Sequence, residues 1–480
     1  MQLVAYGAQD IYLTGNPQIT FFKVVYRRHT NFSMEAIEQT FSGSPDFGRK
    51  VYCTISRNGD LIHRVYLQVK LPAVTAATGS YHRWVNYVGH ALIKSVEIEI
   101  GGQRIDKHYG DWLHIWNELS QTAGKQQGYQ NMVGNVDKLY RPVKAGSATP
   151  ATTLFIPLQF WFCRNPGLAL PLIALQYHEV KINLEFRTFA ELIGHIDAKA
   201  PTTASLDGAS LYVDYIYLDT DERRRFAQVS HEYLIEQLQF TGDESVNQEN
   251  VKVKLNFNHP VKELVWVVQK DACVNSQNLT GSDINGRQWF NYTTAVDSTP
   301  YTQVDNLNMV NMMDNVIDTD PSDRTATDAN LTFGMNDGAT DASANIGGTA
   351  GTLAASREVG LLSTHNKVYD AGVNPVVTAK LTLNGHDRFT EREGRYFNLV
   401  QPYQHHERVP APGINVYSFG LKPEEHQPSG TCNMSRIDNA TLILTLTGVS
   451  NNDPSKVRVY ATNYNVLRIM SGMGGLAYSN

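Results

Sequence analysis

The sequence predicts an all-β protein made of two tandem eight-stranded antiparallel jelly rolls, with short helices and long loop insertions. Segments that alternate apolar and polar residues recur along the chain, and their order is repeated once. Charged residues make up only 18% of the chain, while Gly and Tyr are plentiful, as in loop-rich β proteins. A length of 480 residues is sufficient for more than one domain.

The clearest strand signal is HRVYLQVKL at residues 63–71, in which every second residue from Val65 is Val or Leu. KSVEIEI at 94–100, KINLEF at 181–186 and VKVKLNF at 251–257 alternate in the same way. A period of two places the apolar side chains on one face of a strand and the polar ones on the other. We therefore expect half-buried antiparallel strands in both halves of the chain.

One segment, DWLHIWNEL at residues 111–119, has helical spacing instead. Its apolar residues fall at positions i, i+3, i+4 and i+7, and these are Trp112, Ile115, Trp116 and Leu119. We expect a short helix packed on the edge of a sheet. A ligand platform made by the two tryptophans is the less favoured alternative, because such stripes ordinarily dock helices onto a core.

The repeat is marked by a tight turn in each half. One strand ends at Gly101 and Gly102, and its counterpart ends at Asn384 and Gly385, dipeptides that favour two-residue hairpins. In each half a polar strand, a helix, and then a strand, a corner rich in Pro or Gly and another strand are expected to follow. In the second half, Thr390 and Glu393 fit a capping box at the start of that helix.

The boundary between the rolls is expected near Phe226, after the charged segment DTDERRRFAQ. This divides the chain into an N-terminal arm at 1–26, a first roll at 27–225 and a second roll at 226–480. For the basic triplet Arg223, Arg224 and Arg225, a solvated linker or a salt bridge between domains is preferred over nucleic-acid binding, because the run is short.

The second roll is expected to carry a long acidic loop insertion at about 271–375. Between Tyr301 and Ala350, eight Asp residues are opposed only by Arg324, which gives a local net charge of -7. Asp318, Asp320 and Asp323 are close together in sequence, but the Gly and the terminal Glu of a calcium-binding loop are missing. We predict an acidic surface loop without a bound metal.

No catalytic or cofactor-binding motif occurs in the chain: GxSxG, HExxH, a Walker loop and a GxGxxG followed by an acidic residue are all missing. The four cysteines are far apart, without metal-ligand spacing, which favours a reduced chain. The adjacent His405 and His406 are interpreted as solvated loop histidines. The sequence therefore predicts no enzyme activity, no cofactor and no metal site.

Four segments carry a resemblance to a known family. They are QLVAYGAQDIYLTGNPQITFFKVVYRRHTNF at the start, FNHPVKELVWVVQ in the middle, and SGTCNMSRIDNATLILTL and YATNYNVLRIMSGMGGLAYSN near the end. In this order they resemble the double jelly-roll major capsid protein of nucleocytoplasmic large DNA viruses, a group that includes iridoviruses, phycodnaviruses and marseilleviruses. The match spans nearly the whole chain except the acidic insertion.

The resemblance implies a structural capsid protein located in the virion shell and assembled in the host cell cytoplasm. It implies homotrimers, each a pseudo-hexagonal capsomer that contacts neighbouring capsomers, minor capsid proteins and penton proteins in an icosahedral shell. Direct binding to the genome is not expected. Two other classes of protein stay open as alternatives, namely a minor capsid protein and a glycan-binding jelly-roll module, in which Trp161, Trp266 and Trp289 would stack on sugars.

The apolar and basic segment at 15–32 is then expected to be an arm that leads into the first strand. Its order of charge and apolar residues is the reverse of a secretory signal, and no apolar run is long enough to cross a bilayer. Phe21 and Phe22 would pack on the barrel or on neighbouring chains, and Arg27 and Arg28 would pair with carboxylates at a subunit junction. An intramolecular edge strand is an equally weighted alternative. Contact with an inner membrane is a weaker one, because two arginines carry little charge.

Overall fold

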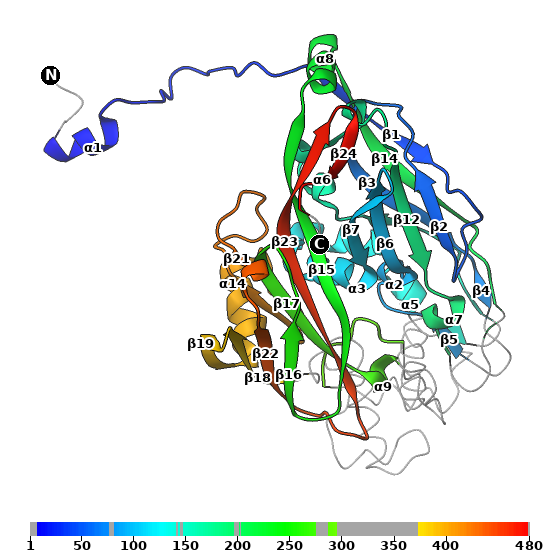
Figure 1. The fold of residues 1–480 in the computed structure, drawn as a ribbon. Coiled ribbons are helices and arrows are strands. Elements are labelled where there is room, and N and C mark those ends of the chain that lie inside the picture. The colour runs from blue at the N-terminus through cyan, green and yellow to red at the C-terminus, as the bar shows by residue number, and fades with distance from the viewer. Residues whose placement is uncertain are drawn as a thin grey trace, which may run out of the picture.

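The computed structural model describes residues 7–75, 81–140, 143–144, 147–195, 201, 203–274, 287–294 and 373–478. Two β-sandwich units lie side by side, and the N-terminal residues extend away from both (Figure 1). We call the unit built from residues 32–218 roll 1 and the unit built from residues 231–476 roll 2. The acidic run at 301–350 and the three aspartates within it lie outside the described residues.

Roll 1 consists of two antiparallel sheets. The first has the strand order β1-β14-β3-β10, with β11 attached to β3, and the second has the order β2-β12-β6-β7. The bounds are β1 Phe32–Gln39, β2 Lys50–Thr54, β3 Leu61–Leu71, β6 Ile93–Ile100, β7 Gln103–Tyr109, β10 Thr152–Pro157, β11 Leu170–Pro171, β12 Val180–Phe186 and β14 Gly208–Leu218.

Roll 2 repeats this arrangement. Its first sheet has the order β15-β23-β17-β20, with β21 attached to β17 and β24 to β23, and its second has the order β16-β22-β18-β19. The bounds are β15 His231–Val246, β16 Asn250–Leu255, β17 Pro260–Lys270, β18 Val376–Leu383, β19 His386–Glu393, β20 Ile414–Ser418, β21 Cys432–Asn433, β22 Ala440–Leu446, β23 Ser455–Met470 and β24 Met473–Leu476.

The strand order is therefore the same in both rolls when the short strands are left out and each roll is numbered from its own first strand. This agrees with the repeat read from the sequence, and the double jelly-roll class is confirmed. The four alternating segments all form strands, namely β3, β6, β12 and β16. The short strands β11, β21 and β24 enlarge the sheets, so eight is not an exact count for either roll.

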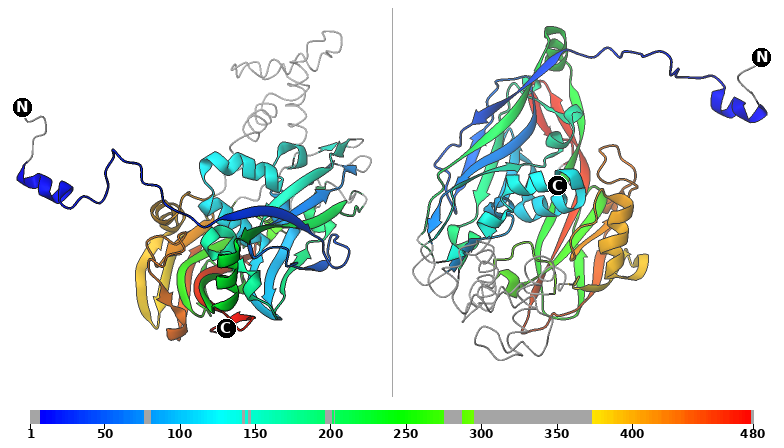
Figure 2. Two further views of the ribbon diagram at one scale, coloured as in Figure 1. Left: turned by 90° about the horizontal axis from the view of Figure 1, so that it is seen from above. Right: turned by 180° about the vertical axis from the view of Figure 1, so that it is seen from behind.

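The remaining elements are helices and small sheets outside the four main sheets, and of these α1 lies on the projecting N-terminal arm (Figures 1 and 2). In roll 1, helix α3 spans Gly110–Ser120, as the apolar stripe predicts. The other helices along the chain are η1 Ala8–Asp10, α1 Ile11–Thr14, α2 Val88–Leu92, α4 Ala123–Val133, α5 Asp137–Tyr140, α6 Trp161–Arg164, η2 Pro166–Leu168, η3 Leu172–Ala174, α7 Phe189–Leu192, α8 Thr220–Gln228, α9 Asp271–Val274 and η7 Met434–Arg436. The short strands outside the main sheets are β4 Val74–Thr75, β5 Tyr81–Trp84, β8 Val143–Lys144, β9 Ala148–Thr149 and β13 Ile193–His195.

The predicted helix start at Thr390 is wrong. Thr390 and Glu393 both lie in strand β19, and the helical turns follow in η6 (Tyr396–Val400) and α14 (Gln401–His405). Glu393 is opposite Thr378 of β18, and Phe389 is opposite Leu381. Pairing with β18 therefore outweighs the local preference for a capped helix, because the strand satisfies backbone groups along its length.

Each roll has its own apolar core between its two sheets. Inward-facing Leu67 and Val69 of β3 meet Ile98 of β6 and Ile182 of β12 in roll 1. In roll 2 the corresponding core contains Leu264, Trp266 and Leu444, among others. Burial of alternate residues on facing sheets supplies most of the stabilisation of such a sandwich.

The segment between the rolls is the helix α8. The Asp219 side chain caps it by accepting a hydrogen bond from the backbone N–H of Glu222 at 3.0 Å. Arg223 forms an ion pair of 2.9 Å with Asp60, which also accepts a hydrogen bond from the backbone of Leu218. At least Arg223 of the basic triplet is thus used in a salt bridge within the chain.

Candidate functional site

The N-terminal arm, which we define as residues 7–31, is the most exposed apolar segment of the described chain. Side chains of Phe21 and Phe22 are 89% and 98% exposed, and the arm projects from the top of roll 1 without lying on either sandwich (Figure 1). Other exposed apolar residues in the arm are Ile11, Tyr12, Leu13, Ile19, Val24, Val25 and Tyr26. An apolar surface of this extent normally marks a site of association.

The arm begins with the short helices η1 and α1 and then continues without regular secondary structure to Phe32, and Arg27 and Arg28 are exposed. The first strand begins at Phe32, where β1 pairs with Leu218 at the end of β14. The arm itself forms no strand with the sheet of its own chain. Its apolar side chains are therefore available to another molecule.

The two hairpin turns named above link equivalent strands. Gly101 and Gly102, with φ of +58° and +85°, join β6 to β7, while Asn384 and Gly385, with φ of +49° and +81°, join β18 to β19. Positive φ at both central residues is the geometry of a tight hairpin turn. A Cβ atom on Gly101 would collide with the ring of His178, so this turn packs closely on its surroundings.

Helix α3 joins the two rolls. Its apolar stripe does not lie on a sheet edge, as the sequence predicted, but on the outer face of the β20-β17-β23 sheet of roll 2. Trp112 contacts Tyr460 of β23, with ring centroids 5.6 Å apart. The stripe and its partners form one buried cluster, which contains Trp112, Ile115, Trp116, Leu119, Val265, Val267, Tyr292, Ile414, Val416 and Tyr460. The expected packing role of the two tryptophans is confirmed.

Ion pairs reinforce the same junction. Asp111, at the start of α3, accepts a hydrogen bond from Arg458 of β23 at 2.6 Å, and both side chains are only 9% exposed. Arg458 also contacts Asp243 of β15 at 2.9 Å. Near the end of α3, Glu118 pairs with Arg408 at 3.3 Å. A buried ion pair of this kind fixes the relative position of its elements more than it adds stability.

A second group of charged residues connects α6 of roll 1 to strands β15 and β17 of roll 2. Glu236 of β15 pairs with Lys262 at 2.7 Å and with Arg164 of roll 1 at 2.9 Å. Burial alone would raise the pKa of Glu236, but Lys262, His426 and Arg164 together lower it to about 2. The carboxylate is therefore ionised at neutral pH, and its pair with Arg164 ties α6 to roll 2.

His406 contradicts the prediction of a solvated loop histidine. Its side chain is fully buried between Glu263 of β17, at 3.0 Å, and Glu424, at 2.7 Å. Burial opposes protonation, yet the two carboxylates raise the pKa of His406 to about 9. His405 beside it contacts the carbonyl of Leu421. The sequence offers no signal for this pairing, because Glu263 and Glu424 are remote from His406 along the chain.

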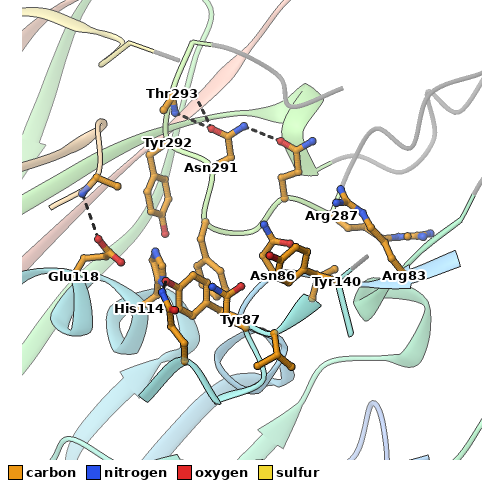
Figure 3. A pocket seen from close by; sticks show the side chains of 18 of the residues that line it. Arg83, Asn86, Tyr87, His114, Glu118, Tyr140, Arg287, Asn291, Tyr292 and Thr293 are labelled. Carbon is orange, nitrogen blue, oxygen red and sulfur yellow. Dashed lines mark hydrogen bonds between the residues drawn. The ribbon is translucent and has the colours of Figure 1, made fainter. Parts of the chain in front are cut away.

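A cavity of about 740 Å³ lies beside the junction, between α3, the segment at 85–87 and the segment at 287–293 (Figure 3). Figure 3 shows Glu118 accepting a hydrogen bond from the backbone of Ala411, and Asn291 bonded to Gln288 and to Thr293. His114 is stacked on Phe290, with centroids 4.4 Å apart. The wall of the cavity is partly basic, because Arg83, Arg287 and Arg408 line it.

The structure also shows the placement of the side chain types that a metal ion or a glycan would require. Among the described residues, no group of three His, Cys, Asp or Glu side chains could hold a metal ion. Trp161, in α6, and Trp266, in β17, are buried in the cores and are not open to a sugar. The guanidinium of Arg187 covers the ring of Trp289 at 3.9 Å, so its face is not open to a glycan.

Within the part of the chain that the structure describes, no helix is long and apolar enough to cross a membrane. The four cysteines are free thiols, of which only Cys432 is partly exposed. The chain thus combines two rolls joined by a buried cluster with an exposed apolar arm, features that suit association with other chains.

Comparisons with known proteins agree with this geometry. Residues 20–219 match the family described as "Major capsid protein N-terminus", and residues 222–475 match "Large eukaryotic DNA virus major capsid protein". The chain is 55% identical to the major capsid protein of Phaeocystis pouchetii virus and 41% identical to that of Paramecium bursaria Chlorella virus 1. Both alignments cover 100% of this chain and 99% of the relative.

Solved structures support the same conclusion. A structure of the PBCV-1 virus capsid is 36% identical with a TM-score of 0.67, and the match covers 96% of this chain and 100% of that one. The Faustovirus major capsid protein, at 13% identity and a TM-score of 0.66, shares the fold. The repeated strand order and the full-length match lead to one conclusion: the chain belongs to the family of major capsid proteins of large eukaryotic DNA viruses.

Proposed function

We propose that three copies of the chain form one capsomer, and that such homotrimers tile an icosahedral shell. The strongest support is the repeated strand order of the two rolls, which lie side by side. Two similar units per chain supply two of the six corners of a pseudo-hexagon, so three copies close it. The buried cluster around α3 contains residues of both rolls and would hold the two units together.

The arm is proposed to fasten one copy to another. Phe21 and Phe22 are exposed in the single chain, and burial of two Phe side chains would contribute about 3–6 kcal/mol before the cost of ordering the arm. Arg27 and Arg28 follow on the same segment and would pair with carboxylates at the edge of the interface. The arm thus combines an apolar centre with a polar rim.

Further partners follow from the place of a capsomer in a shell. Neighbouring capsomers would meet its sides, while minor capsid and penton proteins would meet its inner surface and the vertices of the shell. We propose assembly in the host cell cytoplasm, without catalysis by this chain and without direct genome binding. Contact between the arm and an inner membrane is the weaker proposal, since the arm carries few basic residues.

Light scattering on the purified full-length chain tests the trimer. We expect the mass of a trimer over a dilution series, unchanged by a metal chelator, since large apolar interfaces dissociate only at high dilution. A chain that stays monomeric at every concentration would overturn the proposal.

Paired substitutions test the arm. The double variant Phe21→Ser and Phe22→Ser is expected to dissociate at a concentration at least about tenfold higher, because about 1.4 kcal/mol is enough for that change. Tyr52→Ser, on the outer face of β2 and about half exposed, is the matched control and should leave the mass unchanged. Equal behaviour of the two variants would remove the arm from the interface.

A further inference from the structure

Roll 1 and roll 2 differ in what covers their equivalent surfaces. In roll 1 the segment between β7 and β10 forms α3, and α3 lies on the outer face of the β20-β17-β23 sheet of roll 2. In roll 2 the segment at the same topological position, between β19 and β20, forms η6 and α14. The corresponding sheet of roll 1 is β10-β3-β14.

The helical segment η6–α14 has a buried side and an exposed side. Phe397, Asn398, Gln401 and Pro402 face the interior of roll 2. Leu399 and Val400 are each 39% exposed, and Tyr403 is 80% exposed. Figure 1 shows α14 on the flank of roll 2 that points away from roll 1. Within the described chain, these three side chains therefore face outward, as the stripe of α3 would if roll 2 were removed.

The outer face of the β10-β3-β14 sheet is also incompletely covered. Tyr66 of β3 stacks on Tyr212 of β14, with centroids 5.5 Å apart and rings 4° from parallel, and meets the edge of Phe155 of β10 at 6.4 Å. Phe155 is 37% exposed, and Tyr66 and Tyr212 are half-buried. These three aromatic rings lie on the three strands that correspond to those under α3 in roll 2. Phe155 is opposite Gln68, two residues along β3 from Tyr66.

Strand register makes the correspondence specific. In roll 2, Val265 of β17 lies opposite Val416 of β20 and Tyr460 of β23, and all three are buried under α3. In roll 1, Tyr66 of β3 lies opposite Tyr212 of β14. Tyr460 and Tyr212 thus stand on equivalent strands of equivalent sheets. Tyr460 is buried under α3, whereas Tyr212 is only half-buried.

The sheet face carries charges of both signs, because Arg64 and Lys70 of β3 are exposed on it together with acidic residues. Arg395 is exposed just before η6. On the sheet side, Glu38 is exposed and accepts a hydrogen bond from the Tyr212 hydroxyl at 3.4 Å, and Asp214 is half-buried on the same strand as Tyr212. In the contact inside the chain an acidic residue of the helix, Asp111, meets an arginine of the sheet. Between copies, Arg395 of the helix would meet Glu38 or Asp214 of the sheet.

We infer that the η6–α14 segment of one copy lies on the outer face of the β10-β3-β14 sheet of the next copy, over the Phe155, Tyr66 and Tyr212 rings. This inference rests on the proposed trimer and adds which surfaces meet in it. Each chain offers one such helix and one such sheet face, so the contact is head-to-tail and closes after three copies. Every roll in the ring then uses the same kind of contact, alternately within a chain and between chains.

Site-directed cross-linking tests the contact. Phe155→Cys and Tyr403→Cys are made in separate chains, each with Cys432→Ser to remove the partly exposed native thiol, and the two chains are co-expressed. A short bismaleimide should give a two-chain product on a denaturing gel only when both variants are present. The control pair is Tyr52→Cys with Tyr403→Cys, because Tyr52 is exposed on the other sheet of roll 1.

The native mass of the same samples separates the two levels of the proposal. A trimer in which the Phe155 pair cross-links no better than the Tyr52 pair would overturn this contact and leave the trimer standing. A monomer would overturn both. In addition, Phe155→Glu and Tyr403→Glu should each raise the dissociation concentration of the trimer about tenfold or more, whereas Tyr52→Glu should not.

Discussion

His406 shows how strongly a fold can change the character of a single residue. Beside His405 in the sequence it looks like a surface histidine, but β17 brings the Glu263 carboxylate to 3.0 Å and the 421–430 loop brings Glu424 to 2.7 Å. In this setting the histidine is held as a cation and completes a buried group of charges. Removing it would leave the Glu263 carboxylate buried without its partner, which is costly.

The His406 pair makes stability depend on pH. Because the pKa of His406 rises from 6.5 to about 9 on folding, its contribution is complete below about pH 6.5 and is lost as the pH rises through about 9. His406→Gln should therefore lower the free energy of unfolding by an amount on the order of 3 kcal/mol near pH 6, and the deficit should narrow near pH 9.

Thermal unfolding at fixed chain concentration, near these two pH values, measures this difference. His405→Gln is the matched control, since His405 contacts only a backbone carbonyl at a partly exposed position. A loss of stability in His406→Gln that is the same at both pH values would contradict the protonated state assigned to His406.

The buried Asp111–Arg458 pair gives a second prediction for a single residue. Arg458→Met should destabilise the chain by about 3–5 kcal/mol, because it leaves the buried Asp111 carboxylate with only the longer contact to Arg187 at 3.8 Å. Arg468→Met, on the same strand, removes an exposed pair with Glu232 and should cost less than about 1 kcal/mol. Urea unfolding of both variants at one chain concentration provides the comparison. Equal losses of unfolding free energy in the two variants would contradict the burial of the Asp111 charge at the junction.

The sequence predicted the apolar residues of the arm and of the α3 junction, but it did not predict the ion pairs at that junction. The stripe of α3 and the apolar run around Phe21 are visible because apolar periodicity and clustering are local. Asp111 and Arg458 are 347 positions apart, as ion pairs across a junction commonly are. A single sequence has no signal that links such positions, because the register of the sheets decides which of them meet.

Among the elements, α3 has the largest effect on how the two rolls are held together. Trp112→Ala should cost about 3–5 kcal/mol, since the side chain is fully buried against Tyr460 of the other roll. Met132→Ala in α4 is the control, because Met132 is partly exposed. Limited proteolysis of the α8 segment gives a second readout, as looser rolls should expose the connection. Unchanged cleavage in Trp112→Ala would argue that other contacts hold the rolls.

Elements with a strict period were predicted correctly, and the one predicted from a cap was not. The strands β3, β6, β12 and β16 repeat apolar residues at every second position, which only a sheet can use. Thr390 and Glu393 satisfy a local rule for a helix start, but their segment pairs with β18, where Phe389 lies opposite Leu381 and Glu393 opposite Thr378. Tertiary pairing then decides the structure, as it commonly does where the helix stripe is poor.

For the whole molecule, the acidic insertion is predicted to be separable from the fold. Thr294 and Val373, which flank residues 295–372, are bonded to each other: the Thr294 N–H donates to the Val373 carbonyl at 3.0 Å. Replacing 295–372 by a short Gly-Ser link should therefore keep the melting temperature within a few degrees of the parent chain, since closing a shorter loop costs little. Failure of this variant to fold would show that the insertion is part of the core. Circular dichroism and thermal melting distinguish the two results.

The covalent joining of the two rolls also affects how fast and at what dilution a ring can form. Half of the contacts in the proposed ring are made during folding, at an effective concentration of roughly millimolar or more, and do not depend on how many chains the cell has produced. Closing the ring then scales with the third power of chain concentration instead of the sixth that separate rolls would require. Early in an infection, while the protein is still scarce, this difference in reaction order would decide whether a shell begins to form at all.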